Sequence, residues 1–485
     1  MTTSTTALPP LARRAARPLL HATLFILHAA FFIGASASAQ APAREFFDGA
    51  DDPASKTVMQ QAETDIEKYR KGDFTVTLTD ETGAPLPAAT TATLDLIRHQ
   101  FNFGCSMFRM SRLPDDDPVK KAGLQALLDI FNQVVVVDHW YNPYGEIEDK
   151  QPEKDMAWAA AHAMRTRYHA VLYEEPREAM GKHLATEQFW NLFDERIQYS
   201  TKVTGGKAGA YDLINEALSR KYWNKNNPKS FYRTEPTYPD LSQPEQIVRA
   251  FALARKYLPD AKLTALENPA PHDGPGGERY GEVIAMWKAA LDAGADIDYI
   301  GTQCHFFDDG QPFKPDERKK NKNFYTMAEI SKGLDLQNAL NKPVEITEFT
   351  GPSRNKLKNK EYNQRIWTLS EAENSAWQIN FYKLAFSKPC IIGVTRWNLV
   401  DQFCGRSMDG GILKQDGTPH QIYYDLLKLI KETWHTRVTQ TPDAAGAVAF
   451  RGYYGDYQVA AEGYAPAEIT LTPENQNIKV VLKKK

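Results

Sequence analysis

Cysteine is scarce in this sequence, with only Cys105, Cys304, Cys390 and Cys404 among 485 residues. So few thiols exclude a small scaffold held together mainly by disulfides. No two of them have CxxC spacing, and no cysteine–histidine cluster has the spacing of metal ligands, so the sequence suggests no metal cofactor. One disulfide, between Cys105 and Cys404, is a hypothesis, because both lie near the ends of strands that we expect to be neighbours.

Charge of one sign is also missing, because 58 basic and 61 acidic side chains leave a formal net charge of −3. This balance predicts neither a nucleic-acid partner nor a basic membrane-binding patch. No glycine-rich phosphate loop follows the first expected strand of the main domain, and no Gly-x-Ser-x-Gly motif occurs, which argues against a nucleotide cofactor and a serine hydrolase. The length is sufficient for a large core and for more than one domain.

A targeting segment is expected at the N-terminus. Three arginines between residues 13 and 17 precede an apolar run over 19–33, and Ala37-Ser38-Ala39 supplies small residues for cleavage before Gln40. This order predicts a signal peptide over residues 1–39 and a secreted or periplasmic protein. The alternative is an uncleaved membrane anchor, but the run is short for a span and contains two histidines, so we expect no stable membrane insertion.

From Phe101 onwards, apolar runs of strand length alternate with amphipathic helical stretches. The runs are 101–105, 134–138, 168–173, 211–215, 263–266, 299–303, 344–347 and 392–397, and the helices include 187–199, 244–257, 280–293 and 374–386. Eight apolar strands that alternate with helices predict an α/β fold, a parallel (β/α)8 TIM barrel whose sheet is covered by helices. An open, doubly wound sheet is the alternative, and the count of eight disfavours it.

Short strands flank the predicted barrel on both sides. Alternating segments occur at 74–78 and 91–96 before it, and at 447–450, 455–460, 469–472 and 478–482 after it. We expect the N- and C-terminal strands to form one small accessory β-sandwich, because chain termini often lie close together. The predicted organisation is a signal peptide (1–39), an N-terminal segment with strands (40–100), the barrel (101–435) and a C-terminal small β domain (436–485).

The C-terminal segment carries three closely spaced tyrosines, Tyr453, Tyr454 and Tyr457. Two interpretations are open. Their rings can stack on sugar rings, which would make this domain a carbohydrate-binding module, or they can fill the core of a structural cap. The second interpretation is favoured because aromatic side chains dominate ordinary protein cores.

Two expected barrel strands end in a glutamate, namely Glu216 and Glu348. The carboxyl ends of the strands carry the active site in barrel enzymes, and cleavage of a glycosidic bond needs two carboxyl groups. Other polar and aromatic residues gather at the same expected ends, which favours a site over isolated structural charges. Glu345 is expected to face a helix or to pair locally, and Asp212 to be structural.

Four segments at these strand ends carry further motifs. They are Asp212-Leu213-Ile214-Asn215-Glu216-Ala217, Ile300-Gly301-Thr302-Gln303-Cys304-His305, Ile346-Thr347-Glu348-Phe349 and Gly393-Val394-Thr395-Arg396-Trp397-Asn398. From about residue 101 to 430 the sequence resembles glycoside hydrolase family 10, the endo-β-1,4-xylanase family. The segments are similar to its Trp-Asp-Val-Val-Asn-Glu-Ala, Ile-Gly-x-Gln-x-His, Ile-Thr-Glu-Leu and last-strand tryptophan motifs. Four motifs in this order are fairly specific.

The resemblance implies a mechanism and roles for the residues that match. Glu216 would be the general acid and base, and Glu348 the nucleophile that forms a glycosyl-enzyme intermediate. Their carboxyl groups would lie about 5–5.5 Å apart, as retention of configuration requires. Asn215 would bind the sugar 2-hydroxyl. His305 would orient Glu348 and keep it ionised, and Gln303 would support the acid/base residue.

The substrate-binding shell departs from the family. His169 and Trp397 match its histidine contact and its stacking floor at the cleavage subsite. The segment 136–141, which contains Trp140, lacks the family's lysine, and Tyr173 stands where the family has a tryptophan. We expect Trp140 and Tyr173 to contact the substrate in this altered shell.

Three functions are therefore open. The leading hypothesis is a secreted, monomeric, retaining β-glycosidase that hydrolyses β-1,4-xylan or a related plant polysaccharide. The second is an enzyme of the same mechanism that acts on another β-glycan or a decorated oligosaccharide, which the altered shell favours. The third is a catalytically silent carbohydrate-binding barrel, against which the joint presence of Glu216, Glu348, Asn215 and His305 argues. In each case the partner is a polysaccharide or oligosaccharide.

Overall fold

The computed structural model describes residues 46–87, 89–138, 151–173, 186–218, 239–268, 278–308, 326–354, 369–402 and 409–485. All of them belong to one compact unit, residues 46–485. The predicted signal peptide lies outside the described residues and stays a prediction, as does its effect on localisation. Within the described residues, no helix combines the length and apolar character that a membrane span requires.

In the part of the chain that the structure describes, eight strands close into a barrel in the order β10-β3-β4-β5-β6-β7-β8-β9. Neighbouring strands are parallel throughout. The strands are β3 (Asn102–Ser106), β4 (Gln133–Val137), β5 (Arg165–His169), β6 (Ala210–Asn215), β7 (Lys262–Glu267), β8 (Tyr299–Asp308), β9 (Val344–Arg354) and β10 (Ile391–Arg396). The predicted (β/α)8 barrel is confirmed.

The composition of the strands explains their place. All residues of β4 and β6 are buried, as expected where a parallel sheet is covered on both faces. The ends of three strands differ from the prediction. The run 168–173 ends as a strand at His169, although single contacts with β6 continue, such as the bridge Leu172–Ile214. Strands β8 and β9 are longer than predicted, because they pair with each other as far as Asp308 and Arg354.

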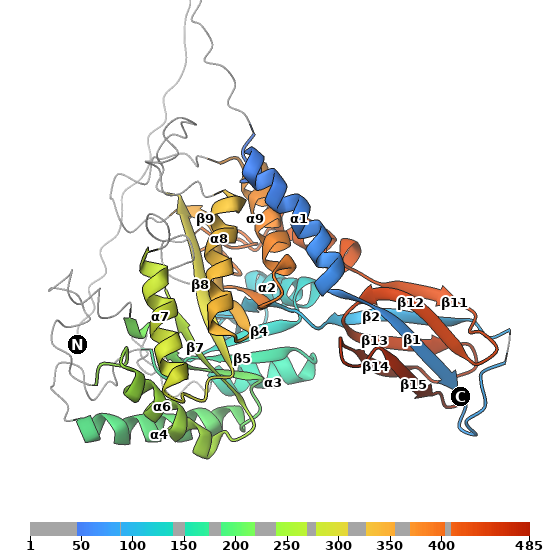
Figure 1. The fold of residues 1–485 in the computed structure, drawn as a ribbon, viewed down its shortest axis with the longest axis horizontal. Helices are drawn as coiled ribbons and strands as arrows, with labels where there is room; N and C mark the ends of the chain where they lie inside the picture. The colour runs from blue at the N-terminus through green and yellow to red at the C-terminus, as the bar shows by residue number, and fades with distance from the viewer. Residues whose placement is uncertain are drawn as a thin grey trace, which may run out of the picture. The chain divides into compact units, whose positions relative to one another are not determined.

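Helices cover the outside of the barrel (Figure 1). The α-helices are α1 (Pro53–Tyr69), α2 (Pro118–Ile130), α3 (Gln151–Ala161), α4 (Thr186–Thr204), α6 (Pro244–Tyr257), α7 (Glu278–Asp292), α8 (Met327–Leu336), α9 (Glu371–Ser387) and α10 (Gln421–Lys428). Helix α9 begins with a capping box, in which Ser370 and Glu373 satisfy each other's backbone N–H groups. Glu373 also accepts a hydrogen bond from the backbone of Phe47 at 3.0 Å, which attaches the chain before α1 to this helix.

The remaining strands form two sheets, with the orders β12-β1-β15 and β11-β2-β13-β14. Their bounds are β1 (Lys71–Thr79), β2 (Ala92–His99), β11 (Arg437–Gln440), β12 (Ala447–Tyr453), β13 (Gly455–Ala461), β14 (Ala467–Leu471) and β15 (Asn477–Val481). Figure 1 shows the blue β1 beside the red β12, and the two pair antiparallel along their length. The predicted sandwich of N- and C-terminal strands is therefore confirmed. The short, half-exposed β11 was not predicted.

Two of the three clustered tyrosines of the C-terminal segment are buried, and Tyr454 is half-buried. Tyr457 is fully buried and Tyr453 nearly so. The Tyr457 ring packs against Phe74 and Phe450, with centroids 6.4 and 5.8 Å away, and its hydroxyl donates to the carbonyl of Tyr453. This packing agrees with a structural cap rather than with a surface that stacks on sugars.

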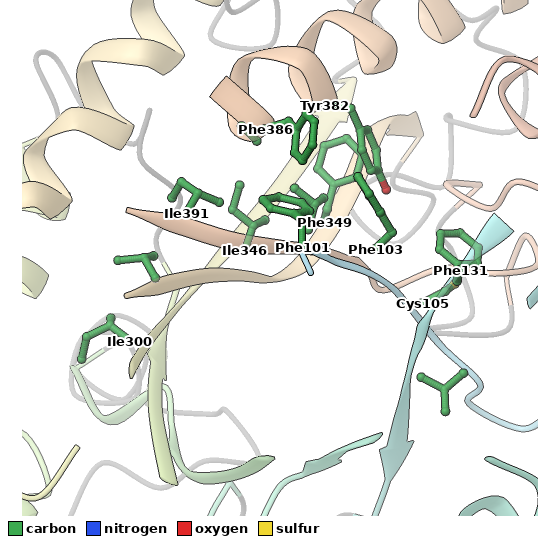
Figure 2. Close-up of a cluster of buried hydrophobic side chains, with 14 of the residues drawn as sticks. Phe101, Phe103, Cys105, Phe131, Ile300, Ile346, Phe349, Tyr382, Phe386 and Ile391 are labelled. Atoms are coloured by element: carbon green, nitrogen blue, oxygen red, sulfur yellow. The ribbon is translucent and has the colours of Figure 1, made fainter. Parts of the chain in front are cut away.

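Aromatic side chains also fill the layer between α9 and the first barrel strand. The Phe386 ring lies 4.9 Å from that of Phe101 and 5.6 Å from that of Phe103, and Figure 2 shows these rings beside Phe349 and Tyr382. Cys105 belongs to the same cluster. Its Sγ lies 3.6 Å from the carbonyl of Ser106, and burial raises the pKa of its thiol to about 12. The other residue of the hypothesised bridge, Cys404, lies outside the described residues, so the bridge stays a hypothesis.

Candidate active site

One amide side chain connects the two predicted carboxylates. Gln303 lies on β8, between β7 and β9 in the barrel, and its Nε2 donates to Glu216 Oε1 at 2.8 Å and to Glu348 Oε1 at 3.1 Å. It also lies 3.1 Å from Asn215 Oδ1. Because both carboxylate oxygens are in hydrogen-bond contact with one nitrogen, they are no more than about 6 Å apart.

Glu216 stands in an unusual backbone conformation directly after β6. Its φ of 60° lies in the left-handed region, which is disfavoured for residues other than glycine and is tolerated where surrounding contacts hold it. Two contacts with the end of β7 hold this turn. The backbone N–H of Glu216 donates to the carbonyl of Leu266 at 2.9 Å, and the N–H of Leu218 donates to the buried carboxylate of Glu267.

Glu348 is buried within β9, with 5% of its surface exposed. Two histidines lie against its carboxylate. Nε2 of His305 is 3.2 Å from Oε2, and Nε2 of His169 is 3.8 Å from Oε1. Together with Gln303, these side chains contact both oxygens, so the carboxylate is held in one orientation.

His169 is in turn anchored by a buried ion pair. Its Nδ1 lies 2.8 Å from Oδ2 of Asp212, whose carboxylate also pairs with the guanidinium of Arg167. Burial alone would raise the pKa of Asp212, but Arg167 and His169 lower it to about 2. Burial lowers the pKa of His169, yet the hydrogen bond to Asp212 and the charge of Glu348 outweigh burial, and the pKa lies above its ordinary value.

Glu345 does not face a helix, as was expected, but lies inside the barrel with no exposed surface. Its Oε2 is 3.0 Å from Nη1 of Arg167, and its Oε1 accepts hydrogen bonds from Gln133 and Thr395 at 2.6 and 2.8 Å. The first alternative, that it faces a helix, was wrong because a bulge in the pairing of β9 changes the simple alternation of faces. The second, that it pairs with its neighbours, agrees with these contacts. Asp212 is structural, as expected, and also anchors a site residue.

The aromatic candidates lie at the same end of the barrel. The Trp397 ring centroid is 5.1 Å from that of His169, and the Tyr173 ring centroid is 6.2 Å from it. Both side chains are half-buried. Of the predicted site residues, Trp140 lies outside the described residues. The others, Glu216, Glu348, Asn215, His169, Gln303, His305, Trp397 and Tyr173, are linked in one constellation by the contacts above.

Four residues in contact with this constellation were given no role from the sequence, although Glu267 lies at a predicted strand end and Asn398 in the last-strand motif. They are Arg167, Glu267, Thr350 and Asn398. One signal was available: Arg167 and His169 are two residues apart in a strand, so their side chains share a face. The partners of the other three depend on neighbouring strands, which the local sequence does not indicate.

Asp401, near the last strand, makes structural hydrogen bonds, and its contacts with other described residues do not include the two catalytic candidates. Its Oδ1 accepts from the N–H of Gly411 and its Oδ2 lies 2.9 Å from Nε2 of His420. These contacts line a cavity of about 730 Å³ at the N-terminus of α9. Asp401 thus joins the chain after β10 to Gly411 and His420. Among the described residues no group of three or more histidine, cysteine or acidic side chains is arranged to hold a metal ion.

A parallel (β/α)8 barrel that holds two carboxyl groups together at the carboxyl ends of its strands defines a glycoside hydrolase of the barrel class. The sequence model of glycosyl hydrolase family 10 matches residues 137–426, more than half of the chain. The chain belongs to this family.

Solved structures of similar fold are xylanases. Native xylanase 10B from Thermotoga maritima is 16% identical, with a TM-score of 0.50 over 69% of this chain and 96% of that one. Xylanase 10B from Thermotoga petrophila RKU-1, in complex with xylobiose, is 15% identical, with a TM-score of 0.51 over 69% and 95%. A thermostable mutant of Xyn10A from Cellvibrio japonicus is 18% identical, with a TM-score of 0.51 over 68% and 97%. These likenesses show the fold.

One curated relative has a different name. The anti-sigma-I factor RsgI6 of Acetivibrio thermocellus is 23% identical over 409 residues. The match covers 83% of this chain but 46% of the relative, so the chain spans about half the length of that protein.

Proposed function

We propose that the protein hydrolyses a β-1,4-linked plant polysaccharide, with xylan as the first candidate, by double displacement with retention of configuration. The observation that carries the proposal is the contact of the Gln303 amide with both Glu216 and Glu348. The separation that this contact permits, no more than about 6 Å between the two oxygens, is shorter than the roughly 6.5–9.5 Å typical of an inverting pair and supports a retaining mechanism.

In the first step, Glu216 gives its proton to the glycosidic oxygen while an oxygen of Glu348 attacks the anomeric carbon. The bond from that carbon to the leaving sugar breaks, and an ester between Glu348 and the remaining sugar forms. In the second step, the Glu216 carboxylate takes a proton from water, the resulting hydroxide attacks the same carbon, and the ester bond breaks. Glu216 is then protonated again and Glu348 is again a carboxylate.

The surrounding residues supply orientation. Gln303 and His305 hold the Glu348 carboxylate, so little rearrangement is needed when it attacks. Asn215 precedes Glu216 and would donate from its amide to the sugar 2-hydroxyl. Trp397, Tyr173 and His169 are grouped beside the nucleophile and would bind the sugar ring of the cleavage subsite.

The nature of the substrate is supported by the relatives. The similar structures are named xylanases, and one holds xylobiose, which favours xylan. The altered segment 136–141 and Tyr173 favour a different β-glycan or a decorated oligosaccharide. A carbohydrate-binding barrel without catalysis is the third candidate, because the curated relative is named an anti-sigma factor and not an enzyme.

The test is release of reducing sugar from glucuronoxylan, arabinoxylan, mixed-linkage glucan and glucomannan. We expect release from xylan and a loss of at least about 1,000-fold in Glu348→Ala, because the nucleophile is removed. Glu468→Ala, which changes an exposed glutamate of the sandwich, is the matched control and should keep full activity. Proton NMR of the first product should show the β-anomer.

Each outcome separates the candidates. Release from another glycan that is lost in Glu348→Ala would keep the mechanism and change the substrate. A first product of the α-anomer would contradict the retaining mechanism. Binding without release from any glycan, equal in parent and Glu348→Ala, would favour the silent binding protein.

A further inference from the structure

The two histidines that contact the nucleophile differ in what holds their other nitrogen. Nδ1 of His169 faces a carboxylate, Asp212, at 2.8 Å. Nδ1 of His305 faces a hydroxyl, Oγ1 of Thr350, also at 2.8 Å. A carboxylate accepts hydrogen bonds, whereas a hydroxyl has one proton to give and can also accept. Which ring nitrogen of His305 carries the proton therefore depends on which group accepts the hydrogen bond from the Thr350 hydroxyl.

The Thr350 hydroxyl is committed to a third residue. It donates to Oδ1 of Asn398 at 2.9 Å. Both Thr350 and Asn398 are fully buried, so solvent does not compete for this bond. Because the single hydroxyl proton is used there, Oγ1 can only accept from the imidazole, and the His305 nitrogen that faces it must carry a proton.

This placement has a consequence at the other ring nitrogen. A neutral imidazole has one N–H, and with that proton on Nδ1, a lone pair on Nε2 faces Oε2 of Glu348 at 3.2 Å. Two lone pairs repel each other. The contact is favourable only when a proton lies between the two atoms, either as imidazolium with carboxylate or as imidazole with carboxylic acid.

The charges in the connected group agree with a shared proton. Among its described members, the permanent cation is Arg167, and the buried carboxylates are Asp212, Glu345 and Glu348, while the half-buried Glu216 is the proposed acid and holds its own proton. Protonated His169 and His305 would supply the two missing positive charges, and buried carboxylates that lack a balancing charge are costly. The pKa of His169 is raised, because the hydrogen bond to Asp212 and the charges of Glu348 and Asp212 together outweigh burial, and this agrees with a protonated His169.

We propose that Thr350, held by Asn398, is a positioning residue that fixes a proton on Nδ1 of His305, so that the hydrogen bond between His305 and Glu348 exists only while a second proton is shared between them. Among the residues that the structure describes, the groups that face this pair include Gln303, Glu216 through Gln303, and His169 with Asp212 and Arg167 behind it. The importance of this bond for catalysis rests on the proposed function, whereas the position of the proton does not.

The test is nitrogen NMR of the full chain labelled with ¹⁵N-histidine, recorded across a pH titration. A protonated ring nitrogen and one with a lone pair have well-separated resonances, and the His305 signals are assigned by their loss in His305→Gln. We expect neutral His305 in the parent to carry its proton on Nδ1. A parent spectrum with the proton on Nε2 overturns the proposal.

Two matched variants test the role of Thr350. Thr350→Val keeps the shape but removes the hydroxyl, and we expect the proton of neutral His305 to move to Nε2, where Glu348 accepts it. Thr350→Ser keeps the hydroxyl and should keep the proton on Nδ1. An unchanged tautomer in Thr350→Val overturns the role of Thr350. If Thr350→Val does not fold, the parent and Thr350→Ser spectra still decide the position of the proton.

Activity of the same parent sample on the polysaccharide panel separates this inference from the proposed function. A parent that cleaves no glycan but carries the His305 proton on Nδ1 would contradict the enzyme and support the proton placement. A parent that cleaves xylan but carries the proton on Nε2 would support the enzyme and contradict the proton placement.

Discussion

At the scale of single residues, Asp212 shows how a buried charge can support a site without touching the substrate. It has no exposed surface and lies between Arg167 and His169. Removal of one partner from a buried ion pair typically costs about 3–5 kcal/mol, because the other charge is left without compensation. Burial therefore makes Asp212 important for stability and, through His169, for the orientation of the nucleophile.

We expect Asp212→Asn to lower the free energy of unfolding by about 3 kcal/mol at neutral pH, because Arg167 and His169 lose the charge that compensates them. Urea unfolding followed by circular dichroism measures this. Asp260→Asn, the same change at an exposed position, is the control and should lie within about 0.5 kcal/mol of the parent. Equal stability of the two variants would mean that the buried pair contributes nothing.

The pH dependence of stability gives a second measurement on the same variant. The pKa of Asp212 is about 2 in the folded protein, against an ordinary value of 3.8. The unfolded chain therefore binds a proton more readily, and the stabilisation, about 2 kcal/mol, is complete above about pH 4 and is lost as the pH falls towards 2. In this range Asp212→Asn should lose less stability than the parent does.

The sequence predicted individual site residues unevenly. Glu216 and Glu348 could be identified because each ends an apolar run, and a carboxylate in that position needs an explanation. The roles of Arg167 and Thr350 could not be predicted, because their partners, Asp212 on β6 and Asn398 after β10, come from other parts of the chain. Glu345 was misplaced because a bulge shifts the register of β9. The local sequence pattern indicates that a residue is buried, but it does not indicate which side chains from other strands contact it.

At the scale of elements, α9 shows how a helix start is fixed. The helix was expected from residue 374, yet it begins at Glu371 with Ser370 as its N-cap. The pattern Ser370-x-x-Glu373 is a capping-box signature and was present in the sequence. Apolar periodicity alone misses such a start, because the first turn of a helix is often polar. In the sequence, Ser370 comes 16 residues after Arg354, the last residue of the strand β9 that carries Glu348.

We expect Ser370→Ala to destabilise the protein by about 1 kcal/mol, because the N–H of Glu373 loses the hydroxyl that accepts its hydrogen bond at 3.2 Å. Chemical denaturation measures the difference. Ser370→Thr keeps a capping hydroxyl and should remain within a few tenths of a kcal/mol of the parent. A cost in Ser370→Thr as large as in Ser370→Ala would point to a steric effect instead of lost capping.

The strands were the best-predicted elements. The barrel strands were recognisable because parallel strands covered on both faces must be apolar throughout, as β4 is. The strand β11 was missed because its four residues are polar or half-exposed, so that no hydrophobic pattern marks it. Its place is set by antiparallel pairing with β2, which lies more than 300 residues earlier in the chain.

At the scale of the whole molecule, the two ends of the described chain fold as one unit. Strand β1 lies between β12 and β15, and β2 lies between β11 and β13. The sequence could suggest this association only from the general closeness of termini, and the register follows from the structure. The predicted boundary at 435/436 therefore separates segments that depend on each other, so it is not a place where the chain can be divided.

We expect a version that ends at residue 435 to lose solubility and to unfold well below the parent, because β1 and β2 lose their partner strands and expose the edges that aggregate most readily. Size-exclusion chromatography and thermal unfolding measure this. A version that begins at Phe46 keeps every strand pair of the compact unit and should elute and unfold as that unit does in the full chain. If the version ending at 435 is soluble and unfolds at the parent's temperature, the barrel is stable without its sandwich, and β1 and β2 need no partner from the C-terminal segment.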